Sequence, residues 1–223
     1  IANHFVVTAV TEPDAKAFGI STFIVEKDCK GFRVGQHIEK TGVRTSTTSE
    51  IVFEDCEVPE ENLLGELNTG FVGSVKLIFG WERSMLLAPP LGGMRANIDR
   101  CVQYTKDRKQ FGKPIAKFQA VRQMIADMKI RLEIGRNLIH RVAWQLDNTE
   151  DPPLVDAAIA KVYVSEAAQK TARDAVQIHG GNGFTIEYQV ERGVRDSLLG
   201  TIGGGTSEIQ RSIIARGVMD LGF

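Results

Sequence analysis

The segment TIGGGTSEIQR, Thr201 to Arg211, places three glycines before two hydroxyl residues, an acid and a helical pattern. Glycine loses much conformational freedom on folding and offers no side chain to pack. Three consecutive glycines indicate either that a bulky group approaches the backbone closely, or that a side chain from another part of the chain takes the place of the missing one. A helix N-terminus also attracts phosphate and other polar groups, so this junction is a candidate binding site. A flexible loop with an N-cap is the alternative.

Two further segments carry residue types capable of chemistry. DRKQFGKP, Asp107 to Pro114, places cations beside Phe111 and a Gly-Lys-Pro turn, and the plain alternative is a charged loop anchored by its aromatic ring. FGWERSMLLA places Glu82 and Arg83 in an apolar helical pattern. These two residues form either a surface pair or a buried acid, and a buried acid would be a catalytic candidate.

Several common sites are excluded by their missing patterns. None of the four histidines follows a glutamate by three residues, so a di-iron bundle site is not supported, and no metal site is predicted. GGNGF, Gly180 to Phe184, follows a helical pattern rather than a strand, which argues against a Rossmann nucleotide site. Cys29, Cys56 and Cys101 are far apart in sequence, lack metal-ligand spacing and are interpreted as ordinary thiols.

The composition is that of a soluble globular protein. Of the 223 residues, 43% are hydrophobic and 25% charged, with a formal net charge of −1. The charge gives no basic excess for nucleic acid. No apolar run approaches the roughly 20 residues that span a bilayer, so no membrane span is expected.

The first part of the chain has the pattern of short strands. Residues 4–10, 19–26, 32–38 and 49–58 are rich in β-branched and aromatic residues, and an antiparallel arrangement fits them best. A β layer of this size is a poor free-standing domain. Because the pattern also begins abruptly at Ile1, we expect a fragment, or a missing half on another polypeptide.

The rest of the chain has helical spacing. Apolar residues recur at helical intervals over 69–88, 118–147, 153–181 and 206–220, with Thr206 or Ser207 as N-cap of the last helix. Pro89 and Pro90 must kink or break the first helix. Long helices with short polar connections predict an antiparallel four-helix bundle. The expected fold is α+β, with a partial β domain over 1–66 and the bundle over 67–223.

These motifs, in this order, resemble the acyl-CoA dehydrogenase family. The resemblance rests on FEDCEVPEENLLGE (53–66), RKQFGKPIAKFQAV (108–121), QIHGGNGF (177–184), Arg195-Asp196 and GTSEIQR (205–211). It implies an N-terminal helical domain and first strands that this chain lacks, a middle β domain and a C-terminal four-helix bundle. It also implies FAD as cofactor and oxidation of acyl-CoA thioesters to trans-2-enoyl-CoA.

The same resemblance implies roles for individual residues. Arg83 would shape the acyl pocket, and Gly205 would pass close to the substrate thioester. A guanidinium pairs well with phosphate, and glycine lets backbone approach a flat cofactor. The residues expected to contact FAD, some of them on a neighbouring subunit, are Arg108, Gln110, Phe111, Gln119, Gln177, Gly180, Gly181, Thr206 and Glu208.

One departure from the family pattern identifies a catalytic candidate. Most members have a glutamate just before the GTS glycine, where it removes the substrate α-proton, but this chain has Gly204. Isovaleryl-CoA-type and long-chain-type members instead place a glutamate before an arginine on the first bundle helix, as Glu82 precedes Arg83 here. A carboxylate in a water-poor pocket is a stronger base than one in bulk water. We therefore expect Glu82 to be the base, and Gly204 to leave room for the acyl group.

Expectations about partners follow from the family. They are an acyl-CoA substrate from fatty-acid or branched-chain amino-acid catabolism, an electron-transfer flavoprotein as acceptor and a homodimer or homotetramer. The compartment stays open between mitochondrial matrix and bacterial cytoplasm. The alternative to an enzyme is a non-catalytic partner subunit that completes the FAD site of another chain. A flavin oxidase or nitroalkane-oxidising enzyme is a third option.

Overall fold

The computed structural model describes residues 2–77 and 82–220, which form two compact units. The first contains the described residues up to Leu77 except Thr41–Val43, and the second contains Thr41–Val43 and the residues from Glu82 onward. The sequence placed a domain boundary after residue 66. Helix α1, Gly70–Leu77, nevertheless belongs to the first unit, because it packs on the strands there and Gly70 lies against Thr22. Residues 78–81 of the predicted first helix lie outside the described residues.

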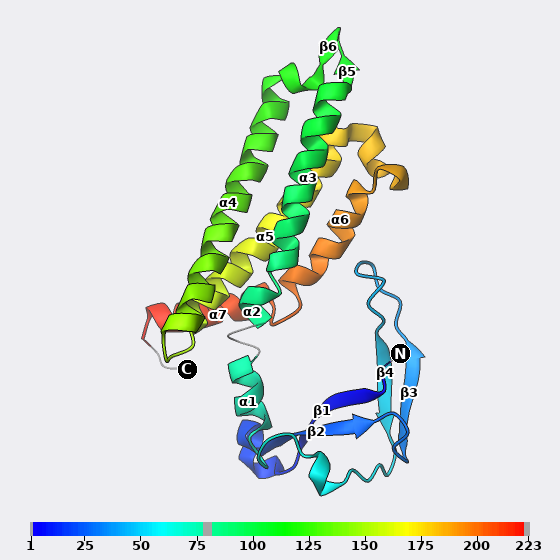
Figure 1. Ribbon diagram of the computed structural model, residues 1–223, viewed down its shortest axis with the longest axis vertical. Coiled ribbons are helices and arrows are strands. Elements are labelled where there is room, and N and C mark those ends of the chain that lie inside the picture. Colours follow the sequence, from blue (N-terminus) through cyan, green and yellow to red (C-terminus); the bar gives the residue numbers. More distant parts are fainter. Residues whose placement is uncertain (1, 78–81, 221–223) are drawn as a thin grey trace. The chain divides into compact units, whose positions relative to one another are not determined.

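The first unit is built from two antiparallel strand pairs (Figure 1). Strand β1, His4–Val10, pairs with β2, Ile20–Glu26, with Val6 opposite Ile24. Strand β3, Phe32–His37, pairs with β4, Ser49–Phe53, with Phe32 opposite Phe53. The four predicted strands and their antiparallel pairing are confirmed. The segment between the first two strands forms a 3₁₀ helix, η1, Pro13–Gly19.

A small aromatic cluster holds the two strand pairs together. The rings of Phe5 and Phe32 lie 4.7 Å apart between centroids, and those of Phe32 and Phe53 lie 5.2 Å apart. Val25 is buried, but Val6 and Val10 on β1 are exposed. This core is small, as expected for a β layer of this size.

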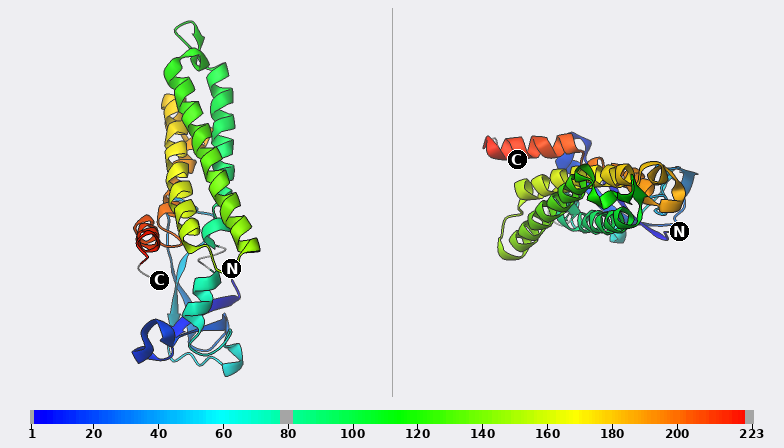
Figure 2. Two further views of the ribbon diagram at one scale, coloured as in Figure 1. Left: turned by 90° about the vertical axis from the view of Figure 1, so that its left-hand side faces the viewer. Right: turned by 90° about the horizontal axis from the view of Figure 1, so that it is seen from above.

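The second unit is a helical bundle (Figures 1 and 2). Its helices are α2 (Arg83–Met85), α3 (Ala88–Asp107), α4 (Gln119–Asn148), α5 (Leu154–His179), α6 (Val190–Ser197) and α7 (Ser207–Val218). A short hairpin of β5 (Lys109–Gln110) and β6 (Lys113–Pro114) joins α3 to α4. The 3₁₀ turns η5 (Gly180–Phe184) and η6 (Ile186–Tyr188) lead from α5 to α6, and η7 (Leu198–Thr201) follows α6. No described helix has the length and apolar character needed to cross a bilayer.

Helix α5 is the centre of the bundle, because it packs against α3, α4, α6 and α7. Its buried face is rich in alanine, including Ala157, Ala160 and Ala175, and small side chains let neighbouring helices approach closely. Leu132 and Met128 of α4 complete the adjoining core. The helix ends at Gly180, whose φ of 58° continues the chain in a conformation that favours glycine.

The two consecutive prolines begin a helix rather than kink one. Pro89 and Pro90 occupy the first turn of α3, where a missing backbone N–H costs no helical hydrogen bond. The predicted break is therefore confirmed, but the helix beyond it was not predicted. Its buried positions, among them Leu91, Met94 and Ile98, follow helical spacing that the intervening glycines and charges obscure.

The fourth position in the bundle is filled by α6 instead of the predicted last helix. Helix α6 runs antiparallel to α5, whereas α7 crosses the N-terminal half of α5, where Arg211 pairs with Glu166 (Figures 1 and 2). The sequence did not predict α6, since its eight residues have only one buried position, Val190. The predicted start of α7 is confirmed, because the Thr206 hydroxyl accepts a hydrogen bond from the Ile209 amide.

The close packing of α4 gives the first prediction. A Cβ atom at Gly135 would lie 2.9 Å from Leu91 Cδ2 and 3.3 Å from Val164 Cγ2. We expect Gly135→Val to lower the free energy of unfolding by about 1–3 kcal/mol, because the neighbours must move. Thermal and urea unfolding followed by circular dichroism would measure this.

The matched control is Gly92→Ala on α3, where no atom lies within 4 Å of the added Cβ. This substitution should raise stability by about 0.5–1 kcal/mol through helix propensity alone. Equal effects of the two substitutions would contradict the packing argument.

Candidate functional site

The predicted acid and its neighbouring arginine occupy different environments. Arg83 begins α2 and is only 4% exposed, whereas the Glu82 side chain is exposed. Burial lowers the pKa of the Arg83 guanidinium to about 10, partly opposed by the charge of Glu82. The sequence left two alternatives for Glu82 and Arg83, a surface ion pair or a buried acid, and neither describes this arrangement. The buried member of the pair is the arginine.

The three glycines form the connection between η7 and α7. The Gly203 amide donates to the Leu199 carbonyl at 2.8 Å, which closes the preceding turn. Gly204 and Gly205 then have φ values of +65° and +89°, where side chains other than glycine are strained. The loop needs glycine at these two positions for its backbone conformation alone.

Two side chains from different helices hold the carbonyl of Gly204. Arg83 Nε donates to it at 3.3 Å, and Gln210 Nε2 donates to it at 3.0 Å. Gln210 is fully buried and also donates to the Gly205 carbonyl at 3.3 Å. A Cβ atom at Gly205 would lie 2.7 Å from Gln210 Nε2, so the absence of a side chain permits this contact. The segment beside Glu82 is thereby fixed to the glycine loop.

Sequence reasoning did not single out Gln210. The signal for it was its spacing, since position 210 is one helical turn after the N-cap Thr206 and therefore faces the preceding loop. A polar residue at that place can bond the loop carbonyls.

A cavity of about 580 Å³ opens beside this contact. Glu82, Arg83, Gly203 and Gly204 line it from one side. The remaining wall is mainly apolar and comes from α3, α5 and the turn after α6, with Leu87, Pro90, Met94, Ala168, Ala172 and Leu199 among its residues. The volume and the apolar lining suit a small organic group. Glu82 is therefore at the rim of the same cavity as Gly204, and a Cβ at Gly204 would meet no atom within 4 Å.

Lys161 of α5 is a second buried cation at this cavity and was not predicted. It is 3% exposed, and its Nζ has no hydrogen-bond partner among the described residues. Burial lowers the pKa of Lys161, the nearby charge of Arg83 lowers it further, and Glu208 and Glu166 raise it. A charged residue inside an alanine-rich helix was its only signal in the sequence. This wall of the cavity carries two buried positive charges.

Thr206 and Glu208 stand at the start of α7, next to the glycine loop. The backbone amide of Glu208 and the hydroxyl of Thr206 lower the pKa of the Glu208 carboxyl. Ser207 between them is buried, and its hydroxyl has no partner among the described residues. These residues present hydroxyl and amide groups at a helix N-terminus, as predicted.

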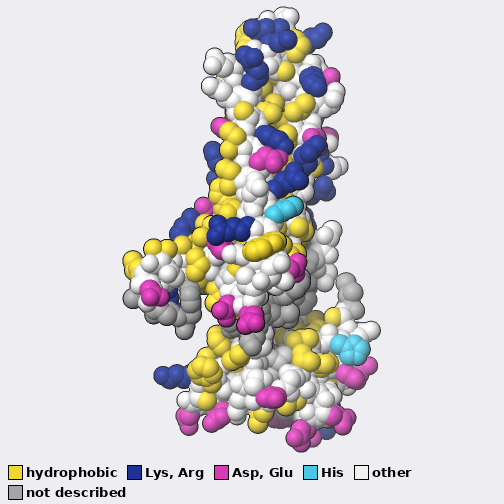
Figure 3. Space-filling model, turned by 60° about the vertical axis from the view of Figure 1, so that its left-hand side comes forward, with side chains coloured by type: hydrophobic (Ala, Val, Ile, Leu, Met, Phe, Trp, Pro, Cys, Tyr) yellow, Lys and Arg dark blue, Asp and Glu magenta, His cyan; other side chains and the backbone are white. Residues whose placement is uncertain are grey.

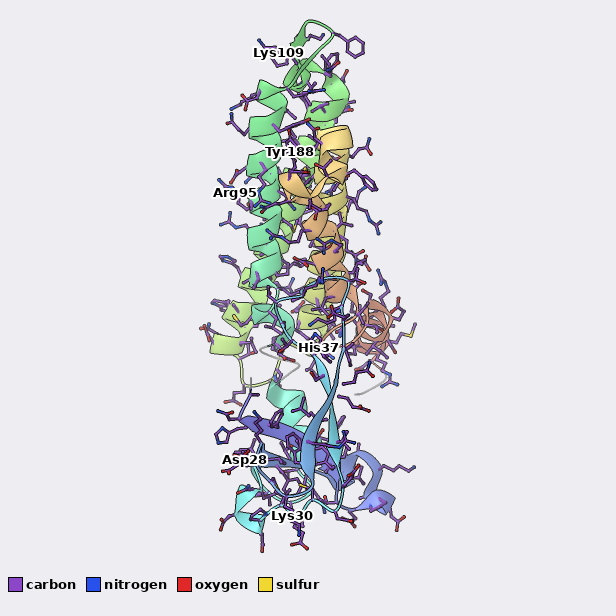
Figure 4. All side chains as sticks on the ribbon, turned by 90° about the vertical axis from the view of Figure 1, so that its right-hand side faces the viewer. Asp28, Lys30, His37, Arg95, Lys109 and Tyr188 are labelled. Carbon is purple, nitrogen blue, oxygen red and sulfur yellow. The ribbon has the colours of Figure 1, made fainter. Side chains whose placement is uncertain are left out.

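Arg108, Gln110 and Phe111 lie at the other end of the bundle, in the β5–β6 hairpin that Lys109 marks in Figure 4. Phe111 is 90% exposed, so the interpretation of its ring as an anchor is wrong. Gln119 is also exposed, at the start of α4. The stretch 108–118 contains four cations and no acid. Figure 3 shows Lys and Arg side chains gathered at this end.

Gln177, Gly180 and Gly181 are exposed at the C-terminal end of α5. No atom lies within 4 Å of a Cβ built at either glycine, so the backbone there is open. His179 between them is buried, stacks on Tyr104 at 4.2 Å and hydrogen bonds to the Ala175 carbonyl through Nδ1. It is a structural residue.

The predicted site residues thus divide between two ends of the bundle. The first half of α3 and the middle of α5 line the cavity, whereas the C-terminal ends of both helices lie beyond it. Both helices run in the same direction along the bundle (Figure 1). Glu82, Arg83, Gly204 and Gly205 come together, with Thr206 and Glu208 beside them. The other predicted residues do not join them. No cluster of three metal-ligating side chains occurs among residues 2–77 and 82–220.

The bundle fold that carries this cavity is shared with known structures that contain FAD. Residues 68–219 match the family described as acyl-CoA dehydrogenase, C-terminal domain. The chain belongs to the acyl-CoA dehydrogenase family.

Individual relatives agree with this assignment. The chain is 42% identical over 219 residues to L-prolyl-[peptidyl-carrier protein] dehydrogenase of Pseudomonas fluorescens, covering 97% of this chain and 56% of that protein. The butyryl-CoA dehydrogenase structure from Megasphaera elsdenii superimposes with a TM-score of 0.93 at 38% identity, covering 98% of this chain and 56% of that one. The structure of PigA with FAD and proline gives 0.95 at 35% identity, covering 100% and 57%. The chain therefore spans little more than half the length of these relatives.

The glycine loop gives a prediction that needs no ligand. We expect Gly205→Ala to lower the free energy of unfolding by about 2–4 kcal/mol, since it combines a positive φ with a clash against Gln210. Gly204→Ala also has a positive φ but meets open space, so it should cost only about 1 kcal/mol. Urea unfolding of both variants measures the difference. Equal losses would show that Gln210 does not constrain the loop.

Proposed function

We propose that this chain is the cavity-bearing part of an FAD-dependent acyl-CoA dehydrogenase that forms trans-2-enoyl-CoA, with Glu82 as the base. The observation that carries the proposal is the shared cavity of Glu82 and Gly204. In most members of the family that this sequence resembles, the position of Gly204 is occupied by the glutamate that acts as the base. A carboxylate that enters the same cavity from Glu82, just before α2, would reach the same substrate atom.

The residues present fit FAD. The four cations of 108–118, with no acid among them, suit a diphosphate. Open backbone at Gly180 and Gly181 suits close approach of a cofactor, and the unpartnered Ser207 hydroxyl at the α7 N-terminus suits a polar group. When bound, FAD would supply the acceptor for the hydride that leaves the β-carbon. Arg108, Gln110, Phe111, Gln119, Gln177, Gly180, Gly181, Thr206 and Glu208 would hold it.

The chain's own residues would act on the proton and on the thioester. Glu82 would take the α-proton of the acyl group while the apolar walls of the cavity displace water from it. Backbone near Gly204 would donate to the thioester oxygen, where negative charge develops. The contacts from Arg83 and Gln210 to the Gly204 carbonyl would keep this backbone in one orientation. Arg83 and Gln210 are therefore positioning residues in this proposal.

The two separate groups of predicted FAD residues support an oligomer. Lys161 and His179 are 18 positions apart on one straight helix, or roughly 27 Å. Residues at the cavity and residues at the far end would then serve the cofactors of different subunits in a homodimer or homotetramer. An electron-transfer flavoprotein would take the electrons. The alternative of a non-catalytic partner subunit predicts no role for Glu82.

A prolyl thioester is the second candidate substrate. The L-prolyl-[peptidyl-carrier protein] dehydrogenase relative and the PigA structure with proline favour it. Arg83 and Lys161 oppose a protonated amine in this cavity, because both positive charges are buried at its wall, and Glu82 and Asp196, which also line the cavity, offset only part of that charge. An uncharged acyl group meets no such repulsion, which is why acyl-CoA is the first candidate.

The base assignment is tested by anaerobic mixing of the complete, FAD-loaded protein with acyl-CoA substrates. Glu82→Gln should slow bleaching of the flavin absorbance at least about 100-fold, the usual contribution of a general base, while bound FAD per subunit stays constant. Glu133→Gln on α4, outside the cavity, is the matched control and should bleach normally. Normal bleaching by Glu82→Gln would place the base elsewhere.

A rescue variant tests the relocation itself. Glu82→Gln combined with Gly204→Glu returns a carboxylate to the family's commoner position, where the structure has open space for it. Partial recovery of bleaching is expected, limited by the strain of a side chain at φ +65°.

The substrate class is tested by comparing branched and straight acyl-CoA thioesters with an L-prolyl carrier-protein thioester. We expect higher kcat/KM for the uncharged acyl groups. Lys161→Met should lower this preference about tenfold, equivalent to about 1.4 kcal/mol, because one buried charge is lost. Lys161→Arg keeps the charge and is the control. Faster flavin reduction by the prolyl thioester in the unaltered protein would favour the second candidate.

A further inference from the structure

Two cysteines of the first unit are neighbours in space although they are 27 positions apart in sequence. The Sγ atoms of Cys29 and Cys56 lie 3.4 Å apart, and both residues are partly exposed. Cys29 lies in the turn between β2 and β3, flanked by Asp28 and Lys30, which Figure 4 labels. Cys56 follows the end of β4. The separation of the cysteines in sequence gave no sign of this closeness in space.

The backbone around Gly31 brings the two thiols together. Phe32 and Phe53 pair across β3 and β4, and the Glu54 amide donates to the Gly31 carbonyl at 2.8 Å. Gly31 has a φ of +84°, and a Cβ there would lie 2.2 Å from the Glu54 carbonyl oxygen and 3.0 Å from Cys56 Cα. The chain before β3 therefore packs directly on the chain after β4. The closeness of the thiols follows from strand register and is built into the fold.

The surroundings assign different roles to the two thiols. Cys29 Sγ also lies 3.4 Å from the Glu57 carbonyl. Desolvation and the hydrogen bond with Cys29 raise the pKa of the Cys56 thiol. A raised pKa leaves less thiolate on Cys56, so we assign Cys56 as the resolving thiol and Cys29 as the first nucleophile.

We propose that Cys29 and Cys56 form a redox-active dithiol that small-molecule disulfides of the glutathione type convert to an intramolecular disulfide. The Cys29 thiolate attacks one sulfur of the reagent, forming a mixed disulfide and releasing one thiolate. The Cys56 thiolate then attacks Cys29 Sγ, forming the Cys29–Cys56 bond and releasing the second thiolate. Two electrons pass from the cysteines to the reagent, and the two cysteine protons go to solvent.

The consequence is a covalent link across the open end of the β3–β4 pair. The bond closes the chain between residues 29 and 56, which contains both strands. It would restrict opening of this end of the first unit in the oxidised state. The inference stands on the thiol geometry and does not depend on the proposed dehydrogenase activity.

Cys101 supplies an internal control. It is fully buried in the α3 face of the bundle core. Burial, together with the charge of Asp174, raises the pKa of its thiol to about 12. We therefore expect Cys101 to stay reduced under conditions that oxidise the pair.

The test is peptide mapping by mass spectrometry after the intact protein is exposed to oxidised glutathione and quenched by alkylation in denaturant. The expected product is one linked peptide pair containing Cys29 and Cys56, about 2 Da lighter than the sum of the two reduced peptides, while Cys101 is alkylated. A reducing agent should restore alkylation of both. Cys56→Ser should instead retain a glutathione adduct on Cys29, because the resolving thiol is missing.

Three results would overturn the proposal. They are full alkylation of Cys29 and Cys56 after oxidation, a stable glutathione adduct on the unaltered protein, and cross-links between molecules in place of the internal bond. A second probe, phenylarsine oxide, bridges two adjacent thiols without oxidising them. It should protect Cys29 and Cys56 from alkylation together, and lack of joint protection would also contradict the inferred geometry.

Discussion

The carbonyl of Gly204 is the point where three segments of the helical unit meet. Arg83 reaches it from α2 and Gln210 from α7, while the glycine loop supplies the acceptor. This contact requires the positive φ values of Gly204 and Gly205 and the absence of a side chain at Gly205. Because the two donors come from different helices, the loop conformation depends on the packing of the whole bundle end. The orientation of the cavity wall beside Glu82 depends on it in turn.

The same wall carries an unusual concentration of buried charge. Arg83 and Lys161 are both almost fully buried. Burial lowers the pKa of each side chain, and the charge of Arg83 lowers the pKa of Lys161 further. Burying cations without full compensation is costly. Glu208 and Glu166 partly offset the cost at Lys161. Buried charges of this kind, which lower the stability of the fold, are found mostly at functional sites, where they create a defined electrostatic environment. The proposed preference for uncharged acyl groups rests on this environment.

The bundle also explains why the family's motifs are dispersed along the sequence. Helix α5 lines the cavity with its middle turns and ends at the open glycines, so one element connects both groups of predicted cofactor residues. Its alanine-rich face allows four other helices to pack closely against it. Motifs distant in sequence are thus set at fixed positions by one central helix. The exposed Phe111 and the cations around it lie at the far end of this arrangement.

The sequence by itself determined the four strands, the ends of α5 and the N-cap of α7, because alternation, prolines, glycines and hydroxyls act over a few residues. It also determined the family, since ordered motifs need no coordinates. Helix α6 and the crossing of α7 depended on packing with α5, which no local pattern contains. The burial of Arg83 rather than Glu82, the contact of Arg83 with the Gly204 carbonyl and the Cys29–Cys56 pair were decided only by tertiary structure. Each joins residues from segments far apart in sequence, and local propensity carries no information about such distances.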